Sequence, residues 1–288
     1  MNTLLDVPAP AKINLFLHVT GQRPDGLHDL QTVFVLLDLS DSLDFESRTT
    51  PAITREDVTS SLTDAPLPTN DLCVKAARLL QQATGYTGGA HIHLTKRIPS
   101  QAGLGGGSSD AASCLIALNR LWETDLDRSA LLQLAAQLGA DVPFFVHGET
   151  AWAQGTGNHL QSIRLPSRCY LVVKPAVGLS TQMIFQHPNL KRDTQPATMI
   201  GFADHCKSHA EHLFGTNDLQ PVASLLCPDI QQSLTRLEYA GLQGRMTGSG
   251  SAVFAPTNAS DALPSWPSDW FQCICHSLVE HPLKNWMR

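Results

Sequence analysis

The chain has 288 residues, and its 20 lysines and arginines against 26 aspartates and glutamates give a formal net charge of −6. This length is sufficient for two domains, and the acidic balance excludes the basic footprint typical of a nucleic-acid-binding protein. No apolar run approaches the length of a membrane helix, and no secretory leader is visible. Seven scattered cysteines are typical of buried, reduced thiols. We therefore expect a soluble cytoplasmic protein that binds neither nucleic acid nor membrane.

The first quarter of the chain predicts strands, because apolar and polar side chains alternate. Antiparallel strands are predicted over residues 12–20, 30–39 and 42–45. In the first of them, Lys12 and Asn14 share the face opposite Ile13, which we interpret as the face away from the core. Residues 48–69 show no periodicity, so an exposed loop is predicted there.

The next stretch places a glycine-rich loop between a strand and a helix. A helix over 72–83, ending near Gly85, and a strand over 90–94 precede it. Four glycines follow within five positions: Gly103, Gly105, Gly106 and Gly107. Such a run can turn successive backbone N–H groups into one anion-binding concavity.

Ser108 and Ser109 are good N-cap residues for the apolar helical pattern that comes after the glycines. A helix N-terminus favours phosphate, so the stretch predicts a nucleotide phosphate site. The pattern is neither the P-loop nor the dinucleotide fingerprint. A flexible surface turn is the alternative interpretation.

The remaining elements mix helices and strands. They are a helix over 129–138 ended by Gly139, short strands over 144–146 and 151–153, a strand over 170–173, a helix around 230–237, and strands over 252–255 and 270–277. The strand at 170 is taken to open a second domain, which divides the chain into residues 1–165 and 166–288. A second loop of small residues, 246–251, is expected to pack against the glycine loop.

Two residues could supply chemistry beside that loop. Asp141 follows a helix end in an apolar neighbourhood, where an unpaired carboxylate would be costly, and it is our candidate general base. Lys12 could hold that carboxylate in its ionised form and stabilise developing negative charge. The alternatives are a local turn aspartate and a solvated lysine.

Histidines offer a weaker signal. His205, His209 and His212 fall at helical spacing and could form a metal site, but a solvated polar face is favoured because no carboxylate or cysteine pattern accompanies them. His91 and His93 share one face of the strand over 90–94 and receive no role.

Three segments together resemble the three motifs of the GHMP kinases, the superfamily of galactokinase, homoserine kinase and mevalonate kinase. They are residues 10–15 (PAKINL), 99–112 around GLGGGSSDAA, and 246–255 (MTGSGSAVFA). Residues 25–32, 139–145 and 181–185 are similar to the branch that phosphorylates the 2-hydroxyl of a cytidine diphosphate-linked methylerythritol, an isoprenoid precursor. The resemblance implies an α/β (two-layer α+β) fold with an N-terminal domain like the second domain of a ribosomal protein and a C-terminal ferredoxin-like domain.

The resemblance also implies roles for individual residues. ATP and Mg²⁺ would be the cofactors, Asp141 the base and Lys12 its partner, with no certain metal ligand in the chain. The ATP phosphates would be held by Pro99, Gly103, Leu104, Gly105, Gly106, Gly107, Ser108 and Ser109. The substrate would be contacted by Asn14, His28, Thr181 and Phe185, with Phe185 stacked on cytosine. Leu27 departs from the tyrosine that this branch generally carries there.

Other functions stay open from the sequence alone. The nearest alternative is a GHMP kinase acting on mevalonate, homoserine or a sugar, and a more distant one is a nucleotide-binding sensor without catalysis. The small-molecule kinase is favoured because both Lys12 and Asp141 are present. A monomer and a homodimer are both compatible with the sequence.

Overall fold

The computed structural model describes residues 2–59, 68–209, 212–258 and 261–287. Its strands are β1 (Thr3–Gln22), β2 (His28–Arg48), β3 (Ile53–Thr59), β4 (Gly89–Lys96), β5 (Ala151–Gly155), β6 (His159–Ser162), β7 (Cys169–Lys174), β8 (Arg245–Met246), β9 (Val253–Thr257) and β10 (Phe271–Leu278). Its helices are α1 (Leu72–Thr84), α2 (Gly106–Leu121), α3 (Arg128–Leu138), α4 (Val142–His147), α5 (Thr181–Gln186), α6 (Met199–Ser208), α7 (Gln220–Leu226) and α8 (Pro228–Tyr239), with a final 3₁₀ turn, Lys284–Trp286.

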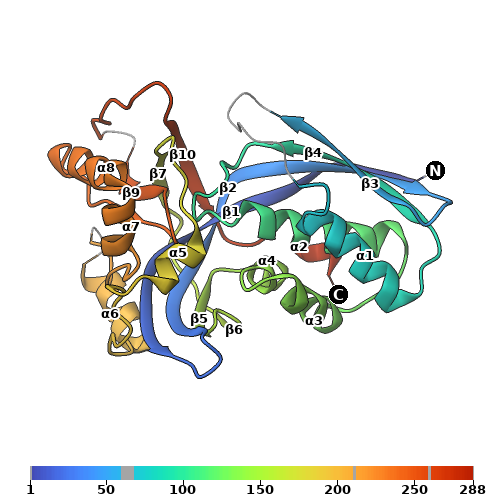
Figure 1. Ribbon diagram of the computed structural model, residues 1–288, viewed down its shortest axis with the longest axis horizontal. Helices are drawn as coiled ribbons and strands as arrows, with labels where there is room; N and C mark the ends of the chain where they lie inside the picture. Colours follow the sequence, from blue (N-terminus) through green and yellow to red (C-terminus); the bar gives the residue numbers. More distant parts are fainter. Residues whose placement is uncertain (1, 60–67, 210–211, 259–260, 288) are drawn as a thin grey trace.

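The described strands form one sheet around a long antiparallel pair. Its main path runs β3-β4-β2-β10-β7-β9-β8, while β1 and β5 pair with β2, and β6 pairs with β5. The β1–β2 hairpin extends through both halves of the molecule (Figure 1). The predicted antiparallel start is therefore confirmed, and the two halves share one continuous framework.

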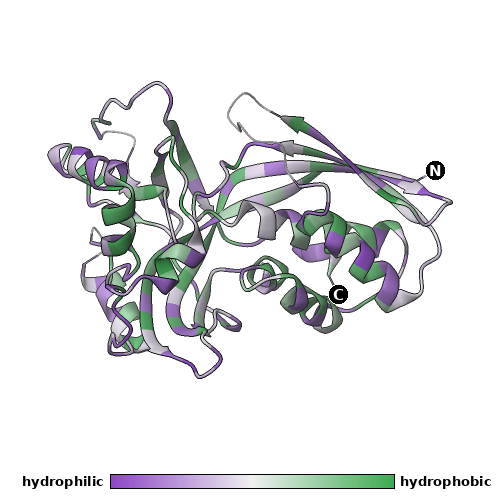
Figure 2. Ribbon diagram, viewed as in Figure 1, coloured by the Kyte–Doolittle hydropathy of each residue, from purple (hydrophilic) through white to green (hydrophobic). Residues whose placement is uncertain are grey.

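Helices cover the sheet separately in each half. In Figure 1, α1 to α4 lie together beside the long strands, whereas α5 to α8 gather at the other end. The largest buried cluster joins Phe45 of β2, Leu80 of α1, Leu115 of α2 and Phe144 of α4. Figure 2 shows hydrophobic and hydrophilic residues alternating along the strands and helices. Burial of this apolar surface, at about 25 cal/mol per Å², fixes the layers.

Two predicted strands prove to be one. The strands predicted over 30–39 and 42–45 form the single strand β2, in which Ser40 and Asp41 pair with Pro10 and Ala9 of β1. The Ser-Asp pair was wrongly interpreted as a turn, because the Asp41 carboxylate is satisfied by partners distant in sequence. The face with Lys12 and Asn14 is buried, not turned away from the core, since the glycine loop covers it.

Two further assignments were wrong. The segment predicted as a loop, 48–69, contains β3, which pairs in parallel with β4; residues 60–67 lie outside the described part. Its strand character is hidden by charged residues, because one side of an edge strand needs no apolar cover. The strand predicted over 144–146 is helix α4, since a short apolar run alone does not distinguish buried helix from strand.

The C-terminal residues return to the N-terminal half. The N–H of His281 donates to the carbonyl oxygen of Gly148 at 2.8 Å, and Leu283 and Met287 join the cluster around Phe144. The last strand, β10, pairs with β2 at Ser277 and Leu278. The division at residue 165 stays a prediction, and any such division has to accommodate this returning segment.

His281 predicts a specific pH dependence of stability. Burial lowers the pKa of its imidazole to about 3, whereas an unfolded histidine titrates near 6.5. Above pH 6.5 the imidazole is neutral in both the folded and the unfolded chain, and its contribution to the free energy of unfolding is fully present. As the pH falls from 6.5 toward 3, the unfolded chain binds a proton that the folded chain does not, so that contribution is lost. The free energy of unfolding therefore decreases as the pH falls through this window. In His281→Asn we expect that decrease to be smaller, by up to about 1.4 kcal/mol per pH unit. Urea unfolding between pH 7.5 and pH 5 measures it; exposed His209→Asn is the control, and parallel curves for His281→Asn and the unmodified protein would contradict it.

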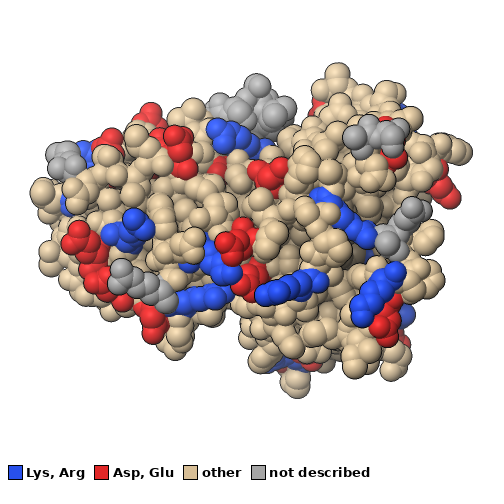
Figure 3. All heavy atoms as spheres, turned by 180° about the vertical axis from the view of Figure 1, so that it is seen from behind, with Lys and Arg blue, Asp and Glu red and all other residues tan. Residues whose placement is uncertain are grey.

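Charge on the molecular surface is mixed. On the face seen in Figure 3, the coloured basic and acidic side chains are interspersed, and neither sign forms a continuous patch over the described residues. None of the described helices combines the length and apolar character needed to cross a bilayer.

Candidate active site

A cleft of about 890 Å³ lies where the glycine loop, β1 and the loop before β9 meet. Most of the predicted site residues line it: Lys12, Asn14, Pro99, Gly103, Leu104, Gly105, Gly106, Gly107, Ser108, Asp141, Thr181 and Phe185. Two predicted residues do not. Ser109 is fully buried behind the loop, and His28 lies beside Phe185, outside the lining.

The start of α2 differs from the prediction. Gly105, not Ser108 or Ser109, is the N-cap, with φ of 73°, and no described side chain caps the helix. The first intrahelical bond runs from the Ser109 N–H to the Gly105 carbonyl at 2.9 Å. The N–H groups of Gly106, Gly107 and Ser108 therefore have no acceptor within the helix. A serine cap would have taken up one of these donors, so glycine at this position leaves all three available for an anion.

The two loops of small residues pack against each other, as expected. The N–H of Ser251 donates to the Gln101 carbonyl at 3.1 Å, and that of Ala252 to the Ala102 carbonyl at 3.2 Å. Gly103 has φ of +72°, and a Cβ built there would lie 2.1 Å from the Thr247 carbonyl oxygen. Close approach of the two backbones thus requires glycine.

Gly103→Ala is expected to lower the free energy of unfolding by about 2–4 kcal/mol, because it combines an unfavourable φ with a backbone clash. Gly85→Ala is the matched control, since Gly85 has φ of +69° and no atom lies within 4 Å of the place that its Cβ would occupy. Its cost is expected to be about 1 kcal/mol. Equal costs in urea unfolding would show that the clash is relieved and that loop contact does not require glycine.

Lys12 and Asp141 meet inside the cleft. The Lys12 Nζ lies 3.4 Å from the Asp141 Oδ2 and donates to the Asn14 Oδ1 at 2.6 Å. Lys12 is 3 % exposed, whereas the Asp141 side chain is 35 % exposed and faces the cleft. Asp141 begins α4, yet its carboxylate makes no capping hydrogen bond. An accessible carboxylate beside a fixed ammonium can accept a proton from a bound hydroxyl.

Asn14 is held by groups that the sequence did not indicate. Its Nδ2 donates to the Thr32 Oγ1 at 2.9 Å, and its backbone N–H donates to the Thr247 Oγ1 at 2.9 Å. These bonds join β1, β2 and the loop before β9. The side-chain Oδ1 of Asn14 is thereby directed at the Lys12 Nζ, which fixes the position of the ammonium.

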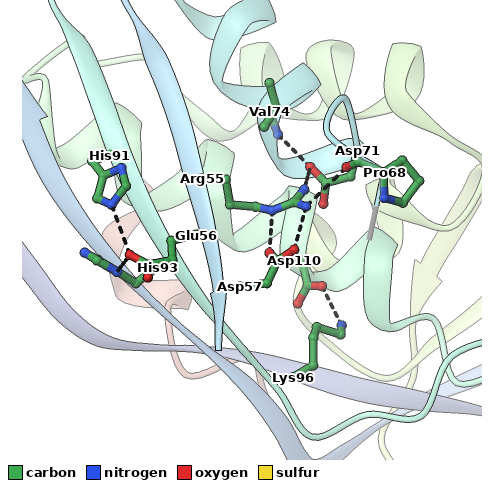
Figure 4. Close-up of polar contacts among 10 residues, drawn as sticks. All are labelled: Arg55, Glu56, Asp57, Pro68, Asp71, Val74, His91, His93, Lys96 and Asp110. Carbon is green, nitrogen blue, oxygen red and sulfur yellow. Dashed lines mark hydrogen bonds and ion pairs between the residues drawn. The ribbon is translucent and has the colours of Figure 1, made fainter. Parts of the chain in front are cut away.

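A buried charge cluster underlies the glycine loop and was also missed. The Lys96 ammonium pairs with the Asp41 carboxylate. It also donates to the Asp110 Oδ2 at 2.6 Å (Figure 4). Burial opposes the charged form of Lys96, but the two carboxylates outweigh it and raise the pKa. For the Asp110 carboxyl, burial is the larger effect and raises the pKa, although the Lys96 charge acts to lower it. The Asp41 Oδ1 accepts the Ile98 N–H at 2.8 Å, so the cluster anchors the start of the loop.

The neighbouring cleft wall is held from β3. Asp71 accepts the Val74 N–H at 3.1 Å and caps α1, while the Arg55 guanidinium pairs with the same carboxylate. Arg55 also binds Asp57 and donates to the Pro68 carbonyl at 3.2 Å (Figure 4). Asp71 and Pro68 line the cleft, so Arg55 fixes this part of its wall.

At the other end of the cleft, His28 and Phe185 lie ring to ring, with centroids 5.1 Å apart. The Arg192 Nε donates to the His28 Nε2 at 3.0 Å, and Arg192 also donates to the Phe185 carbonyl at 3.0 Å. Burial, followed by the Arg192 charge, lowers the pKa of His28. His28 is therefore held neutral, with Nδ1 left to donate. Arg192 is a positioning residue whose role no local sequence pattern signals.

The three histidines at helical spacing do not converge. The rings of His205 and His209 stack at 5.1 Å, and the His205 Nε2 lies 3.1 Å from the backbone oxygen of His212. Among the described residues they form no group with metal-ligand spacing. The polar face that we favoured from the sequence agrees with this arrangement.

Comparison with known proteins decides the family. Residues 71–149 match the GHMP kinases N terminal domain, and residues 202–268 match the GHMP kinases C terminal domain. A 4-diphosphocytidyl-2-C-methyl-D-erythritol kinase of Acidovorax ebreus is 54 % identical over 100 % of this chain and 99 % of its own. The chain belongs to the 4-diphosphocytidyl-2-C-methyl-D-erythritol kinase family. It is thus a GHMP kinase, a small-molecule kinase, and its family implies ATP as a substrate.

Other relatives of the kinase agree. The enzyme of the same name from Polaromonas naphthalenivorans is 54 % identical over 99 % of this chain and 97 % of its own. A crystal structure of 4-(cytidine 5'-diphospho)-2C-methyl-D-erythritol kinase superposes with a TM-score of 0.73 at 34 % identity, covering 89 % of this chain and 90 % of the other. Homoserine kinase from Cytophaga hutchinsonii, at 15 % identity, 98 % and 96 % coverage and a TM-score of 0.67, shares the fold. The predicted GHMP kinase fold is confirmed.

Proposed function

We propose that this kinase transfers the γ-phosphoryl group of ATP to the 2-hydroxyl of 4-diphosphocytidyl-2-C-methyl-D-erythritol. The observation that carries the proposal is the Lys12–Asp141 pair, 3.4 Å apart in a cleft that also contains the uncapped start of α2. Asp141 takes the proton from the hydroxyl as its oxygen attacks phosphorus. Lys12 stabilises the charge that develops on the transferred group, and the bond from γ-phosphorus to the ADP oxygen breaks.

Binding of the triphosphate is assigned to the glycine loop. The free N–H groups of Gly106, Gly107 and Ser108 supply fixed donors, and the 16-residue α2 adds the positive end of its dipole. Oxygen donors in the cleft, such as the Ser108 hydroxyl and the Asp141 carboxylate, suit Mg²⁺, which binds few protein ligands and retains water. Bound Mg²⁺ would neutralise phosphate charge. Pro99, Gly103, Leu104, Gly105 and Ser109 shape this loop.

Substrate recognition is assigned to the end of the cleft near α5. Phe185 offers a ring face for cytosine, and the neutral His28, held by Arg192, offers an N–H donor to the base. Thr181 lies against the Ser249 hydroxyl at 2.6 Å, which links this end to the loop before β9. Asn14 lies between the two ends, beside Lys12. The triphosphate, the reacting hydroxyl and the cytosine are thus assigned to successive positions along the cleft.

The test is magnesium-dependent ADP release with three acceptors: the cytidyl substrate, the same alcohol without its cytidyl group, and mevalonate or homoserine. Turnover with the cytidyl substrate alone is expected. Turnover only with another alcohol would retain the kinase and discard the substrate. Silence with all three would favour a non-catalytic nucleotide-binding protein.

Leu27 provides a gain-of-affinity prediction. It is 54 % exposed in the turn preceding His28, where it would offer a bound cytosine only apolar contact. An added ring is worth about 0.5–1.5 kcal/mol beyond its area, so Leu27→Tyr should lower KM for the cytidyl substrate about 2- to 10-fold and leave KM for ATP unchanged. Leu5→Tyr is the matched control, since Leu5 is also exposed but lies at the opposite end of the β1–β2 hairpin from His28. Equal KM values in all variants would remove Leu27 from the cytosine site.

The setting of the enzyme completes the proposal. We assign it to the cytoplasm, as a monomer or homodimer built from domains 1–165 and 166–288. All seven cysteines are free thiols, which suits a reducing compartment.

A further inference from the structure

A group of metal-ligating side chains lies on the sheet outside the cleft. Glu56 of β3 and His91 and His93 of β4 place one ligand atom each within 4.8 Å of one another (Figure 4). In the parallel register Glu56 is opposite His93, and the two histidines share one face because they are two residues apart. Among the described residues this is the one group of three with metal-ligand spacing.

The spacing suits a tetrahedral ion. The Glu56 Oε2 lies 3.5 Å from the His93 Nδ1 and 3.9 Å from the His91 Nε2. Tetrahedral Zn²⁺ with bonds of about 2.0–2.1 Å requires ligand atoms about 3.3 Å apart. All three ligand atoms lie within 4.8 Å of one another, so binding requires rotations of both histidine rings as well as of Glu56, which is 65 % exposed.

The outer ring nitrogens are already oriented. The Nδ1 of His91 lies 2.6 Å from the Thr54 Oγ1, which leaves its Nε2 toward Glu56. The Nε2 of His93 lies 3.7 Å from the Glu46 Oε1 of β2, which leaves its Nδ1 toward Glu56. Metal-bound histidines characteristically donate their second N–H to a carboxylate or another oxygen. His91 has such a hydrogen-bond partner on β3, and His93 has a carboxylate at ion-pair distance on β2.

We propose that Glu56, His91 and His93 bind Zn²⁺ through one carboxylate and two imidazoles, with water in the fourth position. This inference goes beyond the proposed function and does not depend on it. Imidazole ligands favour Zn²⁺ over Mg²⁺, so the site is distinct in preference from an ATP-bound magnesium.

Zinc at this position would tie β3 to the sheet. The residues that flank Glu56 on β3, Arg55 and Asp57, extend to the other side of the strand, where Arg55 holds Asp71 and Pro68 (Figure 4). A bond from Glu56 to β4 therefore stabilises the strand that supports the cleft wall. Since zinc binds the folded arrangement, it raises the thermal midpoint of unfolding.

The experiment titrates ZnCl₂ into the full chain, without nucleotide, against a fluorescent chelator. His93→Ala is expected to weaken zinc binding by more than about 100-fold, and Thr54→Val, which removes an outer partner, by about 10-fold. The double variant His205→Ala/His209→Ala is the control, because it removes two stacked histidines that lack a carboxylate partner among the described residues. It should bind zinc as the unmodified protein does.

Two further measurements separate zinc ligation by these residues from unfolding and from binding by cysteine. Glu56→Gln removes a ligand from an exposed position, so its loss of affinity cannot come from unfolding. Co²⁺ substituted for zinc should give a four-coordinate spectrum without the charge-transfer band of a thiolate ligand. Unchanged zinc affinity in both His93→Ala and Glu56→Gln, or a cobalt–thiolate band, would overturn the proposal.

Discussion

Asp141→Asn is expected to lower kcat by about 10²–10⁴-fold and to leave the Kd for ATP nearly unchanged. The side chain keeps its size and its place at the start of α4, where it makes no capping bond whose loss could disturb the helix. What disappears is the proposed proton acceptor. The Lys12 ammonium, 3.4 Å away and bonded to Asn14, remains to bind phosphate oxygen.

The matched control is Asp127→Asn. Asp127 also begins a helix, α3, where it accepts the Ala130 N–H, and asparagine caps equally well. It should retain full turnover. Single-turnover phosphoryl transfer and equilibrium ATP binding separate the two effects. Undiminished turnover in Asp141→Asn would remove it as the base, and a parallel loss of ATP affinity would give it a binding role instead.

The site residues that could be predicted from the sequence are those that belong to a short local motif. The glycines of the loop, Lys12 on an alternating strand and Asp141 after a helix end each stand in a short motif, and the structure brings all of them to one cleft. The phosphate-site interpretation used the start of a helix after the glycines, and the structure places that start at Gly105 and not at Ser108 or Ser109.

The residues missed are those whose role depends on contacts distant in sequence. Lys96 meets Asp41 across 55 positions, and Arg192 meets His28 across 164. Nothing near either residue reveals its partner. The same reason explains β3, since an edge strand rich in charge is recognisable only once its pairing with β4 is known. Residues in short motifs could therefore be predicted from the sequence, whereas the residues that position them through contacts distant in sequence could not.

Lys96→Met is expected to lower the free energy of unfolding at pH 7 by about 3–5 kcal/mol, because it leaves uncompensated buried charge. Methionine nearly preserves the volume, so a cavity is not the cause. Asp41 is fully buried and Asp110 is 1 % exposed, and both carboxylates would face each other without a cation. Lys75→Met, at an exposed position on α1, is the control and should cost under about 0.5 kcal/mol.

The pH dependence identifies charge as the cause. Burial raises the pKa of the Asp110 carboxyl, and without the lysine nothing offsets that rise, so the stability deficit grows as pH rises and shrinks as pH falls. Lys96→Met/Asp110→Asn removes one of the two charges and should recover part of the loss at pH 7. In the unmodified protein, the Asp110 Oδ1 has no hydrogen-bond partner among the described residues. The Asp110→Asn substitution replaces one carboxylate oxygen by an amide NH₂ group, which can donate to the Asp41 carboxylate. Urea unfolding at pH 5 and pH 7 decides the matter: a deficit that is independent of pH, and that the second substitution deepens, would mean that Lys96 acts through packing and not through its charge.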